Sequence, residues 1–210
     1  MTGADIAPID LASMLAARLC HDFVNPAGSV VNGLDILAAS PDGDLAREAM
    51  EMIDEGARRL LALIEFSRAA FGAGDEAFAA GRLETLALGV FAPLRPTLDW
   101  AVETPTLSGP AARTLLNFAG MAADALALGG VARAWSELRD GKTFLGVDAI
   151  GPRATLHPEV LAGLTGAARS EGLGGRWARA RFVHATVAEG GGEAGVTTGE
   201  AAITFWANFP

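Results

Sequence analysis

A histidine lies in the string Cys20-His21-Asp22-Phe23-Val24-Asn25-Pro26, where its neighbours have side chains that can assist chemistry. An imidazole can accept a phosphoryl group when one ring nitrogen is a free nucleophile and the other carries hydrogen. Asp22 can accept a hydrogen bond from the ring or take up its proton. Arg18, one helical turn earlier, can steady a phosphoryl charge, and Asn25, one turn later, can contact the phosphoryl group or a partner. The alternative for each is an ordinary solvated side chain on a helix surface.

The surrounding sequence predicts a long helix over about residues 11–39 with one apolar face. The residues of that face recur at steps of three and four: Leu15, Leu19, Phe23, Pro26, Val30, Leu34 and Leu37. His21 falls on the opposite side, because each residue turns the helix by about 100°. Gly28 and Asn32 share its side of the helix. We therefore expect His21 to point into solvent, above a surface that Gly28 keeps low enough for a partner to dock.

Two neighbours of His21 need an explanation of their own. A proline inside a helix costs about 3 kcal/mol, because it removes a backbone hydrogen bond and clashes with the preceding turn. The packing pattern gives no reason for Pro26, so we expect it to bend or loosen the helix beside His21. Cys20 is the chain's one cysteine, which excludes an internal disulfide and a cysteine-built zinc site. We expect it to be a half-buried helix residue, with a redox thiol as the alternative.

The first helix is predicted to form half of a hairpin. Asp10 is a candidate N-cap, the turn Ser40-Pro41-Asp42-Gly43 is rich in helix breakers, and a second helix follows over about residues 44–71. Two long helices joined by so short a turn should lie antiparallel, and their apolar stripe needs a second layer. Pairing with a second copy would give a four-helix bundle. We therefore expect a homodimer.

From about residue 74 the pattern changes to alternating helices and strands. Helices are predicted at about 75–90, 109–128, 158–169 and 176–188, and strands at about 97–103, 131–138, 143–150, 195–198 and 201–209, with a hairpin turn at Asp140-Gly141. This pattern favours a mixed sheet with helices on one face. The fold class is therefore α+β, with a helical-hairpin domain at 1–73 and an α/β domain at 74–210.

The composition excludes several classes of function. The 16 basic and 25 acidic residues give a net charge of −9, which argues against nucleic-acid binding. Apolar stretches such as 86–94 are much shorter than the ~20 residues that a membrane crossing needs. No basic residue precedes Arg18, whereas a secretory signal begins with basic residues. We expect a cytoplasmic protein without membrane contact.

The His21 string resembles the phospho-acceptor box of bacterial sensor histidine kinases. Over residues 19–34 it is more similar to the ChpT-type histidine phosphotransferases of bacterial phosphorelays. That resemblance implies a dimeric helical hairpin followed by a degenerate kinase-like ATPase domain. It implies reversible transfer from a receiver-domain aspartyl phosphate to His21 and on to another receiver's aspartate. The receiver would bring its own magnesium, so the chain would bind no cofactor. The site residues would be His21 and Asp22 for catalysis and Arg18, Asn25, Gly28 and Asn32 toward the phosphoryl group or partner.

The nucleotide motifs of such kinases are incomplete in this chain. Asn117 matches their first asparagine, but Met121 stands where the second one holds the metal, and a thioether is no ligand for magnesium. Near Asp148, no register supplies the aspartate and both glycines of the adenine-binding turn. Gly172-Leu173-Gly174-Gly175 does open a predicted helix as a phosphate loop would, but such a loop is common. We expect neither nucleotide nor metal binding.

Two other functions remain open. The chain could be an intact sensor-kinase core that uses ATP, or a dimeric scaffold in which the hairpin serves assembly alone. A hydrolase is disfavoured, because no serine or cysteine is paired with a base in the sequence. His157 and His184 have no metal-ligand spacing with His21, and we expect both to be structural or solvated.

Overall fold

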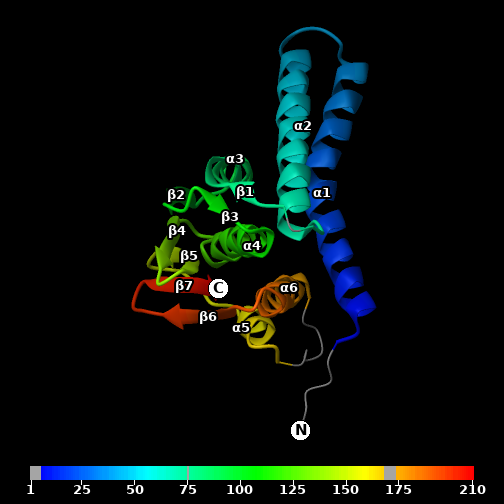
Figure 1. Cartoon of the computed structure of the whole chain (residues 1–210). Helices are drawn as coiled ribbons and strands as arrows, with labels where there is room; N and C mark the ends of the chain where they lie inside the picture. The colour runs from blue at the N-terminus through cyan, green and yellow to red at the C-terminus, as the bar shows by residue number, and fades with distance from the viewer. Residues whose placement is uncertain (1–5, 75, 168–173) are drawn as a thin grey trace.

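The computed structural model describes residues 6–74, 76–167 and 174–210. Two long helices, α1 (Pro8–Ala39) and α2 (Asp44–Phe71), form a hairpin whose tip projects away from the rest of the molecule (Figure 1). The remaining elements form a second body that packs beside the open end of the hairpin. The predicted α+β fold, with a helical hairpin and a mixed-sheet unit, is confirmed.

Small residues let the two helices of the hairpin approach closely. A Cβ on Gly33 would lie 2.6 Å from Cγ1 of Ile53, and one on Gly56 would lie 3.0 Å from the carbonyl oxygen of Pro26. Pro26 and Gly33 are the residues of α1 that are buried. The expectation that packing gives no reason for Pro26 is therefore wrong, because Pro26 is buried and its carbonyl oxygen faces Gly56 of α2.

The start of α1 also differs from the prediction. The helix begins at Pro8 with Ala7 as its N-cap, so Asp10 is not the cap but lies in the first turn. Proline suits the first helical position, where its missing N–H is not needed. A carboxylate in the first turn still faces the positive end of the helix dipole.

The second body contains four helices and seven strands among the described residues. In chain order they are β1 (Phe78–Ala79), α3 (Ala80–Phe91), β2 (Thr97–Val102), β3 (Thr106–Leu107), α4 (Gly109–Ala125), β4 (Val131–Arg139), β5 (Lys142–Ile150), α5 (Pro158–Leu164), α6 (Gly175–Glu189), β6 (Glu193–Thr198) and β7 (Ala202–Phe209).

Three predicted helices are shorter than expected, and the one predicted to reach residue 128 ends at Ala125. The helix predicted from residue 75 begins at Ala80, because Phe78 and Ala79 pair with β3 as a short antiparallel ladder. The helix predicted to reach residue 169 ends at Leu164, and Gly166 then turns the chain with a φ of 70°. Residues 75, 168 and 169 lie outside the described residues.

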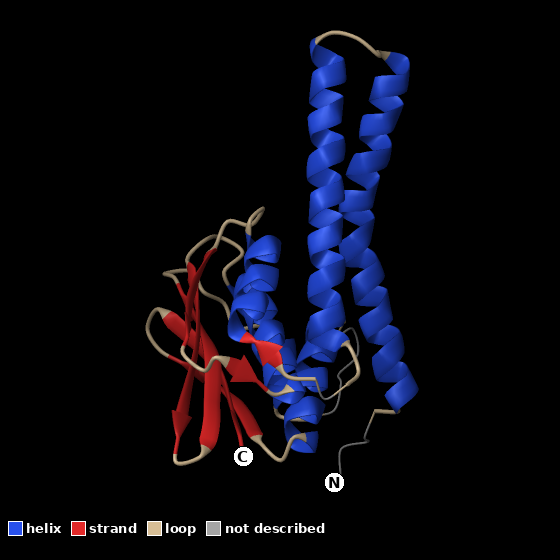
Figure 2. Ribbon diagram, turned by 45° about the horizontal axis from the view of Figure 1, so that its top comes forward, coloured by secondary structure: helices blue, strands red, loops and turns tan. Residues whose placement is uncertain are grey.

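Five strands form one mixed sheet in the order β2-β4-β5-β7-β6. The β2–β4 pair is parallel and the other pairs are antiparallel. The helices cover the sheet face that is turned toward the hairpin (Figure 2). Burial alternates along β7, where Ile203, Phe205, Ala207 and Phe209 are buried and the residues between them are half-buried. This alternation is expected for a sheet that packs helices on one face.

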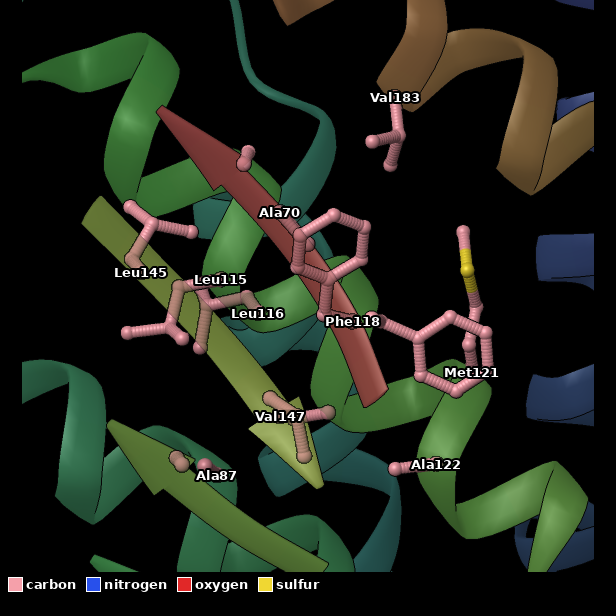
Figure 3. Close-up of a cluster of buried hydrophobic side chains, with 14 of the residues drawn as sticks. Ala70, Ala87, Leu115, Leu116, Phe118, Met121, Ala122, Leu145, Val147 and Val183 are labelled. Atoms are coloured by element: carbon pink, nitrogen blue, oxygen red, sulfur yellow. The ribbon is translucent and has the colours of Figure 1, made fainter. Parts of the chain in front are cut away.

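The hydrophobic core centres on α4. Figure 3 shows Leu115, Phe118 and Met121 of this helix in one buried cluster with Leu145 and Val147 of β5. The same cluster includes Phe66, Ala69 and Ala70 at the end of α2, so the core runs from the sheet into the base of the hairpin. This shared core fixes the hairpin against the second body.

None of the helices among the described residues is both long enough and apolar enough to cross a membrane.

Candidate functional site

His21 lies on the solvent side of α1. Its side chain is 80% exposed, and the predicted exposure is confirmed. The reason is the one expected from the helical pattern, because α1 turns its apolar stripe toward α2 and leaves the opposite side uncovered. The imidazole is therefore accessible to another protein.

Asp22 connects His21 to the interior of the molecule. Its side chain is 30% exposed, and its Oδ1 lies 3.4 Å from Nδ1 of His21. Its other oxygen, Oδ2, lies 3.5 Å from Nε of Arg18, one turn earlier on the helix. A carboxylate in this position favours hydrogen on Nδ1 and leaves Nε2 with its lone pair.

Arg18 is held between two carboxylates. Its Nη2 donates a hydrogen bond of 3.1 Å to Oδ2 of Asp124, which belongs to α4. Its side chain is 17% exposed, so most of the guanidinium is within the protein. The positive charge of Arg18, which was predicted to face a phosphoryl group, is thus already balanced by Asp22 and Asp124.

A cavity of about 530 Å³ opens beside these side chains. Its lining comes from α1, α4 and the beginning of α6: Met14, Ala17, Arg18, His21, Asp22, Asp124, Gly174, Gly175 and Arg176. The sequence interpretation missed Asp124 and Arg176. The one available signal for Arg176 was the pair of glycines just before it, at the beginning of α6. Nothing in the order of the residues indicates which helix faces His21, so Asp124 had no signal.

The other predicted partner residues follow the same side of α1, away from this cavity. Asn25 and Asn32 are exposed, and a Cβ on Gly28 would meet nothing within 4 Å. The stretch beyond His21 is therefore low at Gly28 and carries two amides, as predicted, but the apolar Val24 and Val31 are also exposed along it. Cys20 is exposed rather than half-buried, because it lies outside the contact with α2.

Residues 80–202 match the family described as the histidine phosphotransferase C-terminal domain. The chain belongs to this family. Protein phosphotransferase ChpT of Brucella abortus (strain 2308) is 28% identical to it over 169 residues, which are 79% of each chain. The resemblance inferred from the His21 string is confirmed.

Solved structures agree with this family membership. A bacterial phosphotransferase determined at 1.7 Å resolution has a TM-score of 0.85 and 26% identity, over 96% of this chain and 97% of that one. A histidine kinase, AdeS of Acinetobacter baumannii, has a TM-score of 0.50 and 13% identity, over 90% of this chain and 96% of the kinase. The second likeness shows a shared fold and nothing about activity.

In this member of the family, the asparagine helix has a structural role. Asn117 is fully buried, and its Nδ2 donates hydrogen bonds of 2.9 Å to the carbonyl oxygens of Ala70 and Arg113. Ala70 lies in the last turn of α2, where carbonyl groups lack partners within their own helix. Asn117 therefore caps α2 from the side. Met121 is 2% exposed and fills the core.

The other kinase-like motifs are only partly present. Asp148 lies within β5, and its Oδ1 accepts a hydrogen bond of 2.7 Å from Thr204 of the neighbouring strand β7. Gly174 and Gly175 begin α6, whereas Gly172 and Leu173 lie outside the described residues. The turn after β5 contains Gly151 and Pro152, as the sequence indicated.

The two remaining histidines lie in the second body, His184 within α6 and His157 at the start of α5. Nδ1 of His184 lies 2.8 Å from the carbonyl oxygen of Leu164 and connects α6 to α5, which is the structural role expected for it. His157 is the half-buried N-cap of α5. Across residues 6–74, 76–167 and 174–210, no group of three or more histidine, cysteine or acidic side chains is arranged to hold a metal ion.

Proposed function

We propose that this chain is a histidine phosphotransferase that relays a phosphoryl group between receiver-domain aspartates through His21. The observation that carries this proposal is an imidazole that is 80% exposed on a long helix, with an acidic side chain beside its Nδ1. Family membership supplies the reaction class, and the relative from Brucella abortus is named a protein phosphotransferase.

The chemistry requires no group from the chain beyond those near His21. Nε2 attacks the phosphorus of an aspartyl phosphate, so a P–N bond forms while the P–O bond to the donor carboxylate breaks. The donor leaves as a free carboxylate, and the positive charge that develops on the imidazole ring is offset by Asp22. The reverse sequence passes the phosphoryl group to the aspartate of a second receiver. Magnesium for both steps would come with the receiver domain.

The receiver would dock over the exposed side of α1. Asn25, Gly28 and Asn32 leave this surface low and supply amide groups for hydrogen bonds. The cavity beside His21 adds Arg176 from α6. A docking partner would therefore contact the hairpin and the second body together. We propose that this takes place in the cytoplasm, as expected from the sequence.

A homodimer through the hairpin is part of the same proposal, with residues 1–73 as the dimerisation and phosphotransfer domain and 74–210 as the degenerate kinase-like domain. Both long helices expose large apolar side chains, including Val31 at 56% and Leu61 at 57%. A second copy would cover them by completing a four-helix bundle. We expect Val31→Glu with Leu61→Glu to give a monomer in light scattering, whereas Leu138→Glu, at an exposed position on β4, should stay dimeric. A dimeric double variant would contradict this assembly.

We also propose that the chain has no ATP-dependent kinase activity. The first asparagine of the nucleotide motif is used to cap α2, and the second is replaced by a buried methionine. Asn117 is fully buried and Met121 has no oxygen atom, so neither position offers an accessible oxygen ligand to a nucleotide-bound metal.

The deciding experiment supplies label from two sources. The chain is incubated with a receiver domain carrying radiolabelled aspartyl phosphate, and separately with radiolabelled ATP and magnesium. A phosphotransferase takes label from the receiver alone, and acid-labile, base-stable label identifies phosphohistidine. Label from ATP would instead indicate a sensor-kinase core. Label from neither source, together with retained effects on a binding partner, would indicate a scaffold.

A further inference from the structure

Four charged side chains meet where α1, α4 and α6 come together. Arg18 and Asp22 come from α1, Asp124 from α4 and Arg179 from α6. Three of them form a continuous chain of ion pairs, in which Arg18 lies 3.1 Å from Asp124 and 3.5 Å from Asp22. The chain continues from Asp22 to Nδ1 of His21 at 3.4 Å. A carboxylate of the second body is thus connected to the imidazole through two intermediate side chains.

The fourth member, Arg179, lies deepest. It is 8% exposed, and burial is the main reason that its pKa falls to about 10. The nearby charge of Arg18 lowers this pKa further, while Asp124 and Asp22 raise it. The guanidinium occupies space that only a glycine leaves free, because a Cβ on Gly120 would lie 2.0 Å from its Nη1. The two arginines together offset the two carboxylates.

Stability alone does not explain such a cluster. Moving charged groups out of water costs several kcal/mol per ion, and well-packed apolar residues at the same junction are often as stabilising or more so. A buried ion network does fix the orientation of its members, because each charge must face its partner. At this junction Asp22 and Asp124 both reach the surface, at 30% and 28% exposure, and Asp22 is the one that lies beside His21.

We propose that Asp124 is a positioning residue for phosphotransfer, acting through Arg18 and Asp22 on the imidazole of His21. Asp124 holds one end of the Arg18 guanidinium, and Arg18 turns one oxygen of Asp22 toward itself so that the other faces Nδ1. The hydrogen on the imidazole is thereby kept at Nδ1 and the lone pair at Nε2, the nitrogen that attacks phosphorus. The second body of the fold, which has lost its nucleotide motif, thus sets the reactive form of His21.

The first test is kinetic and rests on the proposed function. Asp124→Asn keeps the shape of the side chain and removes its charge. We expect single-turnover transfer at saturating receiver to slow about tenfold, with the half-saturating receiver concentration unchanged, because orientation and not docking is lost. Asp124→Glu should recover part of the rate. Asp99→Asn removes the partner of Arg133 on the sheet and serves as the matched control, with the wild-type rate expected.

A double-variant comparison separates action through Arg18 from an independent effect. If Asp124 works through Arg18, then Arg18→Gln combined with Asp124→Asn should transfer no more slowly than Arg18→Gln alone. If Asp124→Asn slows the Arg18→Gln variant by the same factor as it slows the wild type, the two residues act independently and the proposal is overturned. An Asp124→Asn defect that lies wholly in the half-saturating receiver concentration would overturn it as well.

The second test reads the imidazole directly and needs no activity. Nitrogen-15 NMR of His21 should show an excess of the Nδ1–H tautomer in the wild-type chain. In Asp124→Asn this ratio should move toward that of Asp22→Asn, measured below the unfolding temperature of each variant. An unchanged ratio overturns the positioning role even if transfer is slow. A changed ratio in a chain that accepts no phosphate would preserve the positioning role and refute the proposed function.

Discussion

Two motifs of this chain resemble those of histidine kinases, and the fold treats them in opposite ways. The histidine string lies on α1, where one side of the helix faces solvent and His21 is 80% exposed. The asparagine string lies on α4, which is surrounded by α2, α3, α6 and the sheet, and Asn117 is completely buried. A polar side chain on α1 can meet a partner protein, whereas one on α4 must find its hydrogen bonds inside the molecule.

The difference shows that a motif keeps its chemistry only while the fold keeps it accessible. Asn117 retains the residue type of a metal ligand, but it is fully buried, and its Nδ2 donates to the carbonyls of Ala70 and Arg113. His21 retains both the residue type and the exposure. Exposure, more than residue type, therefore separates the motif that we propose transfers phosphate from the structural one.

A crossed pair of variants gives the strongest test of this contrast. His21→Gln should abolish label uptake from a phospho-receiver and leave the free energy of unfolding unchanged, because an exposed side chain contributes little to stability. Asn117→Ala should lower the free energy of unfolding by about 1–3 kcal/mol, because it leaves the buried carbonyl of Ala70 without a partner. Its transfer rate per folded molecule should stay near that of the wild type.

Denaturant unfolding and single-turnover transfer measured on both variants check this pair. The contrast fails if Asn117→Ala loses transfer while it is still folded, or if His21→Gln unfolds more easily than the wild type.

Much of this arrangement could be predicted from the order of residues. The steps of three and four residues along α1 place His21 opposite the contact with α2, and the turn at 40–43 is short enough to require a hairpin. The five strands of the main sheet were predicted from strand-like runs separated by turn residues, whereas the two-residue strands β1 and β3 were not predicted. These features are local, so a periodicity is sufficient to find them.

The parts that could not be predicted depend on contacts between distant segments. Asp124 lies 106 residues from Arg18, and no local pattern indicates that they pair. Pro26 has no explanation until its contact with Gly56 of the other helix is known. Phe78 and Ala79 resemble the start of a helix, but a tertiary ladder with β3 overrides that preference.

Replacing Met121 with the asparagine that kinases carry at this position should not restore ATP binding. Met121 is part of the core, so Met121→Asn buries an amide with no partner prepared for it. We expect the free energy of unfolding to fall by about 2–4 kcal/mol, and calorimetry with ATP and magnesium to show no binding. Met121→Leu, which conserves volume and polarity, is the control and should cost less than about 1.5 kcal/mol. ATP binding by a stable Met121→Asn chain would show that α4 is still accessible.

The glycines of α1 allow the exposed side of this helix to be compared with its buried side. A Cβ at Gly28 meets open space, so Gly28→Leu should leave the chain folded and raise helix propensity by up to about 1 kcal/mol. The added side chain would stand on the surface where we propose that the receiver docks, and we expect transfer at a limiting receiver concentration to slow about tenfold, equivalent to ~1.4 kcal/mol.

Two matched glycines serve as controls for that variant. Gly33→Leu should unfold the hairpin, because its Cβ would already meet Ile53 at 2.6 Å. Gly81→Leu, at an open position on α3, should leave both folding and transfer unchanged. Normal transfer by Gly28→Leu would mean that the receiver docks elsewhere.

The smallest expected effect concerns the boundary between the two regions. Arg176 lies in the first turn of α6 and lines the cavity beside His21, so it belongs to the second body but faces the side of α1 that carries His21. Because its side chain is exposed, Arg176→Gln should slow transfer at a limiting receiver concentration by about threefold, in keeping with the ~0.2–1 kcal/mol of exposed ion pairs. The difference should shrink as salt is raised, since screening weakens attraction to an acidic partner surface. Arg95→Gln, in the loop before β2, is the control and should show no such salt-dependent difference. An equal effect of both variants would mean that α6 adds only general charge, and that α1 alone carries the docking surface.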